Sequence, residues 1–240
     1  MRIEEAEGRL RDYLLNGIAA EIFRTEQSYS LAEEIGKYAE GINAANFGEL
    51  FGALQIMLSD RHTLSTVKIF DPAKQYPTRS IPGTLALLQS HAELWHLREP
   101  RRLRHVLVSA GSDASVVDQM SNVELTLAMV RRFRETLPDP NRLSLDDLAL
   151  SLDVLRESRD KMIAHNEAID LASLRTPTWG DVKSLLNYAK QFVSTVGFGY
   201  LGLHFGEGSD NYPLSHNARR TSNTLRRLLK AANVIEEPRL

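Results

Sequence analysis

Apolar residues recur every three or four positions along most of the chain. Residues 3–28 show this period clearly, with apolar side chains at Ile3, Ala6, Leu10 and Leu14. This is the spacing of one face of an α-helix, and no convincing alternation of the kind expected for a half-buried strand accompanies it. We therefore predict an all-α fold, a bundle of long antiparallel helices with extra helices near both ends of the sequence.

The same period predicts the other elements. Further helices are expected at about 31–43, 47–59, 83–97, 100–110, 114–137, 145–168, 178–196 and 217–232. The segment 60–83 contains three prolines and mixed polar residues, so we predict a turn, a short apolar piece and a loop there. We divide the chain into a helical domain at 1–205 and, at 206–240, a polar loop followed by a basic helix.

Two helix starts carry capping signals. Ser144 followed by Asp147 resembles a capping box, and Thr178 with Asp181 three residues later predicts a second one. Beyond the first start, a heptad-like seam extends through Leu145, Leu148, Leu152, Leu155, Arg159, Met162, Asn166 and Ile169.

Composition excludes several classes of function. The net charge of −2 provides no global basic field for nucleic acid, and the absence of cysteine excludes disulfides, thiolate zinc sites and cysteine nucleophiles. His91 and His96 are five residues apart rather than four, so we expect no metal and no cofactor. No apolar run of about 20 residues occurs, which predicts a cytoplasmic protein without membrane contact.

Two further motifs are weak on their own. The stretch GFGYLG at 197–202 matches a dinucleotide fingerprint, but it follows a predicted helix rather than a strand, so packing through small residues or a helix end is the better interpretation. The basic residues of the last helix, from Arg219 to Lys230, form either a solvated face or a contact for phosphate or an acidic partner.

The stretch RDKMIAHNE at 159–167 holds an arginine and a histidine separated by five residues. Spacings of four to six are expected about twice by chance among 22 arginines and seven histidines in 240 residues, and the chain has two. Position is more informative, because Arg159 occupies the apolar seam, where a charged guanidinium is costly unless it is paired or faces a cleft. Arg159 could also pair with Asp153, Asp160 or an acid of a neighbouring helix.

This helix, with arginine, a polar residue, apolar residues and then histidine, resembles the HEPN superfamily and its motif R-x(4–6)-H. The longer strings RDKMIAHNE and TPTWGDVKSLLNYAKQF resemble the branch named after the AbiU abortive-infection proteins of bacteria, as does LSDRHTLSTVKIFDP at 58–72. The resemblance covers most of residues 5–205. It implies paired helical domains that often act as metal-independent ribonucleases, while other members bind nucleotides or are modified by a nucleotidyltransferase.

The residues suit such a reaction. His165 can exchange protons near neutrality, Arg159 can hold phosphate oxygens, and Asp160 can orient either of them. Asn166 and Lys161 are candidate substrate-binding residues. A second set of candidates consists of Asp60, Arg61 and His62, which could equally cap a short helix.

Helix geometry adds a condition. On one continuous α-helix, six steps leave Arg159 and His165 roughly 120° apart, so one helix does not easily bring both to one phosphate. We therefore expect a homodimer with its groove at the interface, RNA as substrate, and a cognate antitoxin or nucleotidyltransferase as a possible partner. Two alternatives are a non-catalytic nucleotide-binding module and a helical interaction protein.

Overall fold

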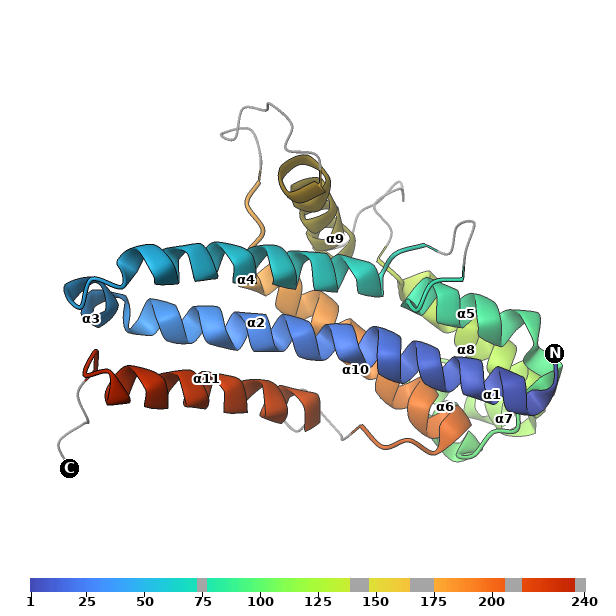
Figure 1. Cartoon of the computed structure of the whole chain (residues 1–240). Helices are drawn as coiled ribbons and strands as arrows, with labels where there is room; N and C mark the ends of the chain where they lie inside the picture. Colours follow the sequence, from blue (N-terminus) through green and yellow to red (C-terminus); the bar gives the residue numbers. More distant parts are fainter. Residues whose placement is uncertain (73–76, 139–146, 165–174, 206–212, 236–240) are drawn as a thin grey trace.

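The computed structural model describes residues 1–72, 77–138, 147–164, 175–205 and 213–235, and the fold of these residues is all-α. A long continuous rod of helix, residues 3–37, runs along most of the length of the molecule (Figure 1). The helices are α1 (Ile3–Asp12), α2 (Ala20–Lys37), α3 (Ala39–Ala44), α4 (Gly48–Ile69), α5 (Ile81–Ser90), α6 (Pro100–Ser109), α7 (Ala114–Gln119), α8 (Asn122–Thr136), α9 (Asp147–Ser158), α10 (Trp179–Leu201) and α11 (Pro213–Ala231).

Two π-helical segments and a 3₁₀ turn complete the described elements. One π-helical segment, Tyr13–Ala19, joins α1 to α2 without a break, and the other, Arg159–Ala164, follows α9 directly. The 3₁₀ turn is Ala92–Leu94. A π-helix bonds each N–H to the carbonyl five residues back and often marks a functional site, so its presence at Arg159 is relevant below.

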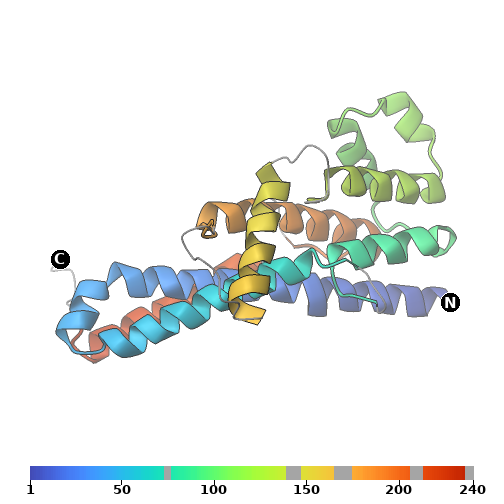
Figure 2. The same ribbon diagram turned by 90° about the horizontal axis from the view of Figure 1, so that it is seen from above.

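The rod organises the packing. Helix α3 reverses the chain so that α4 returns alongside α2, and α11 lies along another side of α2 (Figures 1 and 2). The main core lies where α1, α5, α6, α8 and α10 meet, and its largest fully buried side chains include Tyr200, Phe70 and Phe192. A second cluster at the α3 end holds Ile35, Ile42, Phe51, Leu229 and Val234.

The sequence prediction was wrong for residues 60–69. These residues are not a turn and a loop but the second half of α4. Their polar side chains Thr63, Ser65 and Thr66 are buried rather than exposed. Thr66 donates its hydroxyl to the carbonyl of His62 at 2.7 Å, which satisfies the hydroxyl within the helix.

Other predicted boundaries need smaller corrections. The helix expected at 114–137 is two helices, because Ser121 caps α8 in a box with Glu124. The motif helix changes from α to π geometry at Arg159, so the continuous seam assumed for 145–168 does not hold across that residue. Ser144, the predicted cap of this helix, lies outside the described residues.

The structure confirms the interpretation of the GFGYLG stretch as a packing element and helix end. It closes α10, with Gly202 as the C-cap at φ +63°. At Gly199 a Cβ would lie 2.5 Å from the side chain of Leu103, so only glycine allows α6 this close. Within the described ranges, no helix is long and apolar enough to cross a membrane.

Candidate functional site

Helix α9 crosses α4 and carries Arg159 at its end (Figure 2). Two side chains fix its position. Arg156 donates to the carbonyl of Phe70, the residue after α4, at 3.1 Å, and Ser151 donates its hydroxyl to Asp181 in the first turn of α10 at 2.9 Å. The end of α9 is therefore tied to the C-terminal end of α4, while its middle is tied to the start of α10.

The side chain of Arg159 bonds two carboxylates. Its Nε donates to Asp160 at 2.6 Å and its Nη1 donates to Asp71 at 3.1 Å. The Arg159 side chain is 26% exposed, so it lies at the edge of the protein rather than in its core. The expected pairing of Arg159 with Asp160 is thus confirmed, while its second partner, Asp71, lies just after α4 rather than on a neighbouring helix.

These contacts do not neutralise the guanidinium. Its hydrogen bond with Asp160, followed by the charges of Asp160 and Asp71, raises the pKa of Arg159 further above its ordinary value despite partial burial. The hydrogen bonds to Asp160 and Asp71 occupy two of the five N–H donors of the guanidinium. The guanidinium therefore stays protonated at the protein edge, and its remaining N–H donors could bond a phosphate oxygen at contact distance.

Asp71 is the site residue that the sequence analysis missed. It is the second residue after α4, and its carbonyl accepts a bond from the Ser80 hydroxyl at 2.7 Å. Ser80 also caps α5 by accepting from Gly83 N–H at 3.2 Å. One serine therefore links the start of α5 to the loop that holds Asp71. The sequence signal was the dipeptide Asp71-Pro72, which places an acid at a helix stop.

The other residues predicted on the motif have different positions. Lys161 forms an ion pair with Glu157 one turn earlier. Asp160 reaches Arg159 and is about half exposed. His165 and Asn166 lie outside the described residues. Arg159, Asp160 and Asp71 are thus the motif-centred cluster that the structure brings together.

The second predicted set, at residues 60–62, lies within α4. These residues do not cap a short helix, because α4 begins at Gly48. Arg61 is exposed and Asp60 is half-buried, and neither forms an ion pair with another described residue. The Nδ1 atom of His62 is buried without a hydrogen-bond partner among the described residues. Burial lowers the pKa of His62, which keeps the imidazole neutral at pH 7.

The residues that the structure describes contain no group of three or more histidines and acids placed to hold a metal ion. The candidate site is therefore an arginine and two carboxylates at the meeting point of α4, α9 and the π-helical segment. Such a set can bind and orient an oxyanion through Arg159, but the described part of it supplies no proton-transfer group of neutral pKa.

Comparison with known families gives a match over most of the chain. The sequence model of the AbiU2 branch of HEPN domains matches residues 9–225, from α1 into α11. Comparisons with curated proteins and with solved structures found no match. The match includes α4, α9 and the π-helical segment, and therefore all residues of the candidate site.

Proposed function

Because the chain belongs to the AbiU2 family of HEPN proteins, we propose that it is a metal-independent endoribonuclease that serves as a toxin or an anti-phage effector. Arg159 and His165 carry the reaction, Asp160 and Asp71 position Arg159, and a homodimer assembles the groove. The observation that supports this most is the placement of Arg159, which remains charged, partly exposed and held by two carboxylates at the first residue of a π-helical segment.

The reaction uses the 2′-hydroxyl of RNA as the nucleophile. His165 takes the proton from this hydroxyl, the oxygen attacks the adjacent phosphorus, and a 2′,3′-cyclic phosphate forms as the bond to the 5′-oxygen breaks. The leaving 5′-oxygen gains a proton from a second acid. In a two-fold dimer, the same histidine of a second copy supplies that proton.

Arg159 acts on charge rather than on protons. The phosphorane gains negative charge as the attacking oxygen approaches, and a guanidinium fixed in advance stabilises that charge without reorganising. Asp71 and Asp160 hold the guanidinium of Arg159 in place through two of its N–H donors, which leaves the other donors for a phosphate oxygen. Asn166 and Lys161 are proposed substrate contacts beside this centre.

A cleavage assay tests the proposal. The purified full chain is incubated with fluorescently labelled single-stranded RNA in EDTA, and product formation is followed on denaturing gels. Cleavage should persist in EDTA and should fall about 100-fold or more in both Arg159→Ala and His165→Ala. The product should end in a cyclic phosphate.

The matched control is Arg131→Ala, which removes an exposed arginine of α8 and should cleave like wild type. Circular dichroism melting checks that Arg159→Ala folds, because loss of its ion pairs could mimic loss of catalysis. Cleavage by both motif variants at the wild-type rate would refute the assignment. So would an enzyme that loses activity in EDTA and regains it with Mg²⁺.

The dimer has its own test. Analytical ultracentrifugation at assay concentrations should show a species of twice the chain mass. Adding an excess of His165→Ala chains to wild-type chains should lower the cleavage rate, because each mixed dimer lacks one of the two histidines of the groove. A monomer that cleaves RNA at full rate would contradict the dimer arrangement while leaving the Arg159 and His165 assignment standing.

A further inference from the structure

A pocket lies between α6, α8 and α10, and one residue of α9 also lines it. Its volume is about 570 Å³, within the range of about 300–1,000 Å³ typical of ligand sites. None of Asp71, Arg159 and Asp160 lines this pocket. A function for it would therefore be independent of the ribonuclease proposed above.

Part of the pocket wall is apolar and continuous with the main core. Phe133 and Tyr188 are buried core residues whose rings meet edge to face, with their centroids 6.2 Å apart and their planes at 88°. Val106 and Leu148 are half-buried and pack against the same core. Ala110, the residue after α6, completes this apolar part of the lining. The pocket therefore offers an apolar surface to the hydrocarbon part of a ligand.

Two hydroxyl groups of the lining are already used within the protein. Tyr188 donates its hydroxyl to the carbonyl of Phe133 at 2.8 Å. Thr136 donates its hydroxyl to the carbonyl of Arg132 at 3.1 Å. Because a hydroxyl has one hydrogen, neither group has a donor left for a ligand. The donors that a ligand would meet here are therefore nitrogen atoms.

Three helices each bring a side chain with N–H groups to the pocket. Arg132 of α8 is half-buried, and its guanidinium forms no hydrogen bond or ion pair with another described residue. Gln191 of α10 is exposed, and its amide likewise has no partner in the described ranges. His105 of α6 is exposed, and its ring nitrogen lies 3.5 Å from the Ser109 hydroxyl, at the limit of a hydrogen bond. A ligand that accepts hydrogen bonds would suit all three side chains.

The charges of the lining favour one negative charge on the ligand. Arg102 and Arg132 are positive at pH 7, and Glu135 is the one carboxylate among the described residues that line the pocket. One positive charge is therefore in excess. A half-buried guanidinium without a carboxylate is costly, so a ligand carboxylate beside Arg132 would gain a charge-assisted hydrogen bond. The two charges of a phosphate monoester would exceed this single positive charge.

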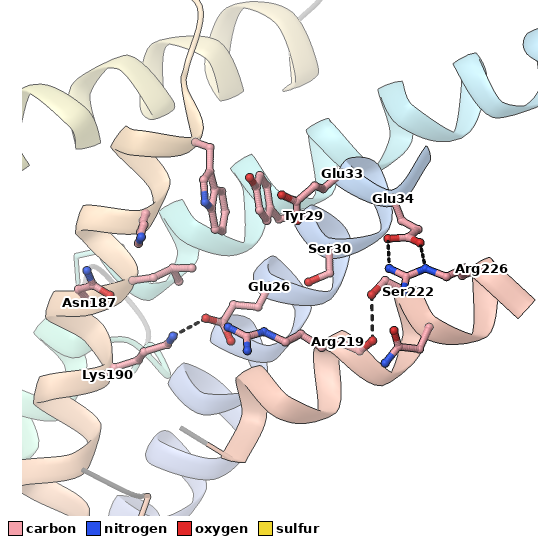
Figure 3. A pocket seen from close by; sticks show the side chains of 14 residues that line it. Glu26, Tyr29, Ser30, Glu33, Glu34, Asn187, Lys190, Arg219, Ser222 and Arg226 are labelled. Carbon is pink, nitrogen blue, oxygen red and sulfur yellow. Dashed lines mark hydrogen bonds and ion pairs between the residues drawn. The ribbon is translucent and has the colours of Figure 1, made fainter. Parts of the chain in front are cut away.

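The pocket between α2, α10 and α11 differs in this respect (Figure 3). There Lys190 donates to Glu26, and Arg226 forms a two-pronged pair with Glu34 at 2.5 and 3.0 Å. Carboxylates of the protein thus already satisfy these two cations, which have little to gain from an anionic ligand. Arg132 has no such partner in the part of the chain that the structure describes.

We propose that the pocket between α6, α8 and α10 binds a small organic monoanion, a carboxylate carried on an apolar body. The carboxylate bonds the guanidinium of Arg132, and Gln191 and His105 offer further N–H donors. The apolar body lies against Phe133 and Leu148. An uncharged apolar molecule would leave Arg132 unmatched, while a bare carboxylate such as acetate would leave the apolar wall in water.

Calorimetric titration of the full chain tests the proposal with two acids as probes, 4-phenylbutyrate and octanoate. We expect at least one of them to bind saturably, with one site per chain. Two further probes each carry half of the ligand: 4-phenylbutanol has the aromatic body without the charge, and acetate has the charge without the body. Each should bind at least about tenfold more weakly than the acid.

Substitutions on α8 and α10 locate the binding. Arg132→Ala should weaken binding of the acid about tenfold or more, and Arg132→Lys should weaken it less, because it keeps the charge but loses the planar fork. Gln191→Ala should weaken it about threefold. Arg131→Ala removes the exposed neighbour of Arg132 outside this pocket and should bind the acid like wild type. Melting curves verify that each variant folds.

Several results would overturn the proposal. Absence of saturable binding by both acids would do so, as would an affinity that Arg132→Ala leaves unchanged. Equal affinity for 4-phenylbutanol and 4-phenylbutyrate would show that charge is not recognised. Tighter binding of phenyl phosphate than of 4-phenylbutyrate would contradict a monoanion site. These titrations contain no RNA, so their outcome leaves the proposed ribonuclease to its own test.

Discussion

Replacing Asp181 by alanine should destabilise the protein more than the loss of an ordinary helix cap. Asp181 accepts from the N–H and hydroxyl of Thr178 at 2.9 and 2.6 Å, as the N-terminal box of α10. It also accepts from the Ser151 hydroxyl of α9 at 2.9 Å and from Arg175 at 2.8 Å. One carboxylate therefore caps α10 and ties α9 to it.

The magnitude follows from burial. The Asp181 side chain is 6% exposed, and Ser151 is buried too, so alanine leaves a buried hydroxyl without its acceptor. A lost cap costs about 0.5–2 kcal/mol and an unsatisfied buried group about 1–3 kcal/mol. The Arg175 side chain is 55% exposed, so its ion pair with Asp181 adds little to the free energy of unfolding. We expect the free energy of unfolding to fall by about 2–4 kcal/mol.

Urea unfolding followed by circular dichroism at 222 nm measures this change. Glu124→Ala is the control, since it breaks the same kind of capping box at the exposed start of α8 and should cost clearly less. A loss below about 0.5 kcal/mol in Asp181→Ala, or an equal loss in the control, would refute the reasoning.

The same carboxylate predicts a pH dependence. Burial alone would raise the pKa of Asp181, but the bonds from Thr178 and Ser151 and the charge of Arg175 outweigh it and lower this pKa below 3.8. The stabilisation is therefore fully present above pH 3.8 and is lost as the pH falls through the lower folded value. The gap in stability between wild type and Asp181→Ala should narrow only below that pH.

Three further predictions concern other contacts. Asp71→Asn should lower the ribonuclease rate about tenfold, measured in the cleavage assay, with a stability change below about 1 kcal/mol, because its pair with Arg159 is partly exposed. Gly199→Ala should lower the free energy of unfolding by about 1–3 kcal/mol in urea unfolding, because the new Cβ would clash with Leu103. Gly52→Ala has open space around its Cβ and should raise the free energy of unfolding by up to about 1 kcal/mol. Lys190→Met should lower the free energy of unfolding by about 3–5 kcal/mol in urea unfolding, because it leaves the carboxylate of Glu26 buried without its partner.

The sequence predicted the parts of the fold that depend on local signals. The box of Thr178 and Asp181 is present as expected, since capping needs only residues three apart. The prediction for residues 60–69 was wrong because Thr66 and Ser65, although buried, are polar like the residues of a loop. Their hydroxyls can be satisfied inside a helix, and hydrophobic periodicity does not register that.

The site was predictable only in part for a similar reason. Arg159 stood out because a charge on an apolar seam needs a partner, but its partner Asp71 lies 88 residues away. Pairings of that range depend on how α9 crosses α4, which no local pattern encodes. The change to π geometry at Arg159 likewise left no sequence signal. The pocket between α6, α8 and α10 draws on three distant segments and was missed altogether.

The pairing of Arg159 has a consequence for how substrate approaches. Two carboxylates surround the guanidinium of Arg159, Lys161 is matched by Glu157, and the third cation of this region, Arg156, bonds a carbonyl, so cations and carboxylates balance here and attract an anion little at long range. RNA would be attracted by cations elsewhere, such as those exposed on α11, and would meet Arg159 only at contact distance. Raising the ionic strength should therefore slow the association of RNA with the protein. The rate at which bound RNA is cleaved should stay nearly unchanged.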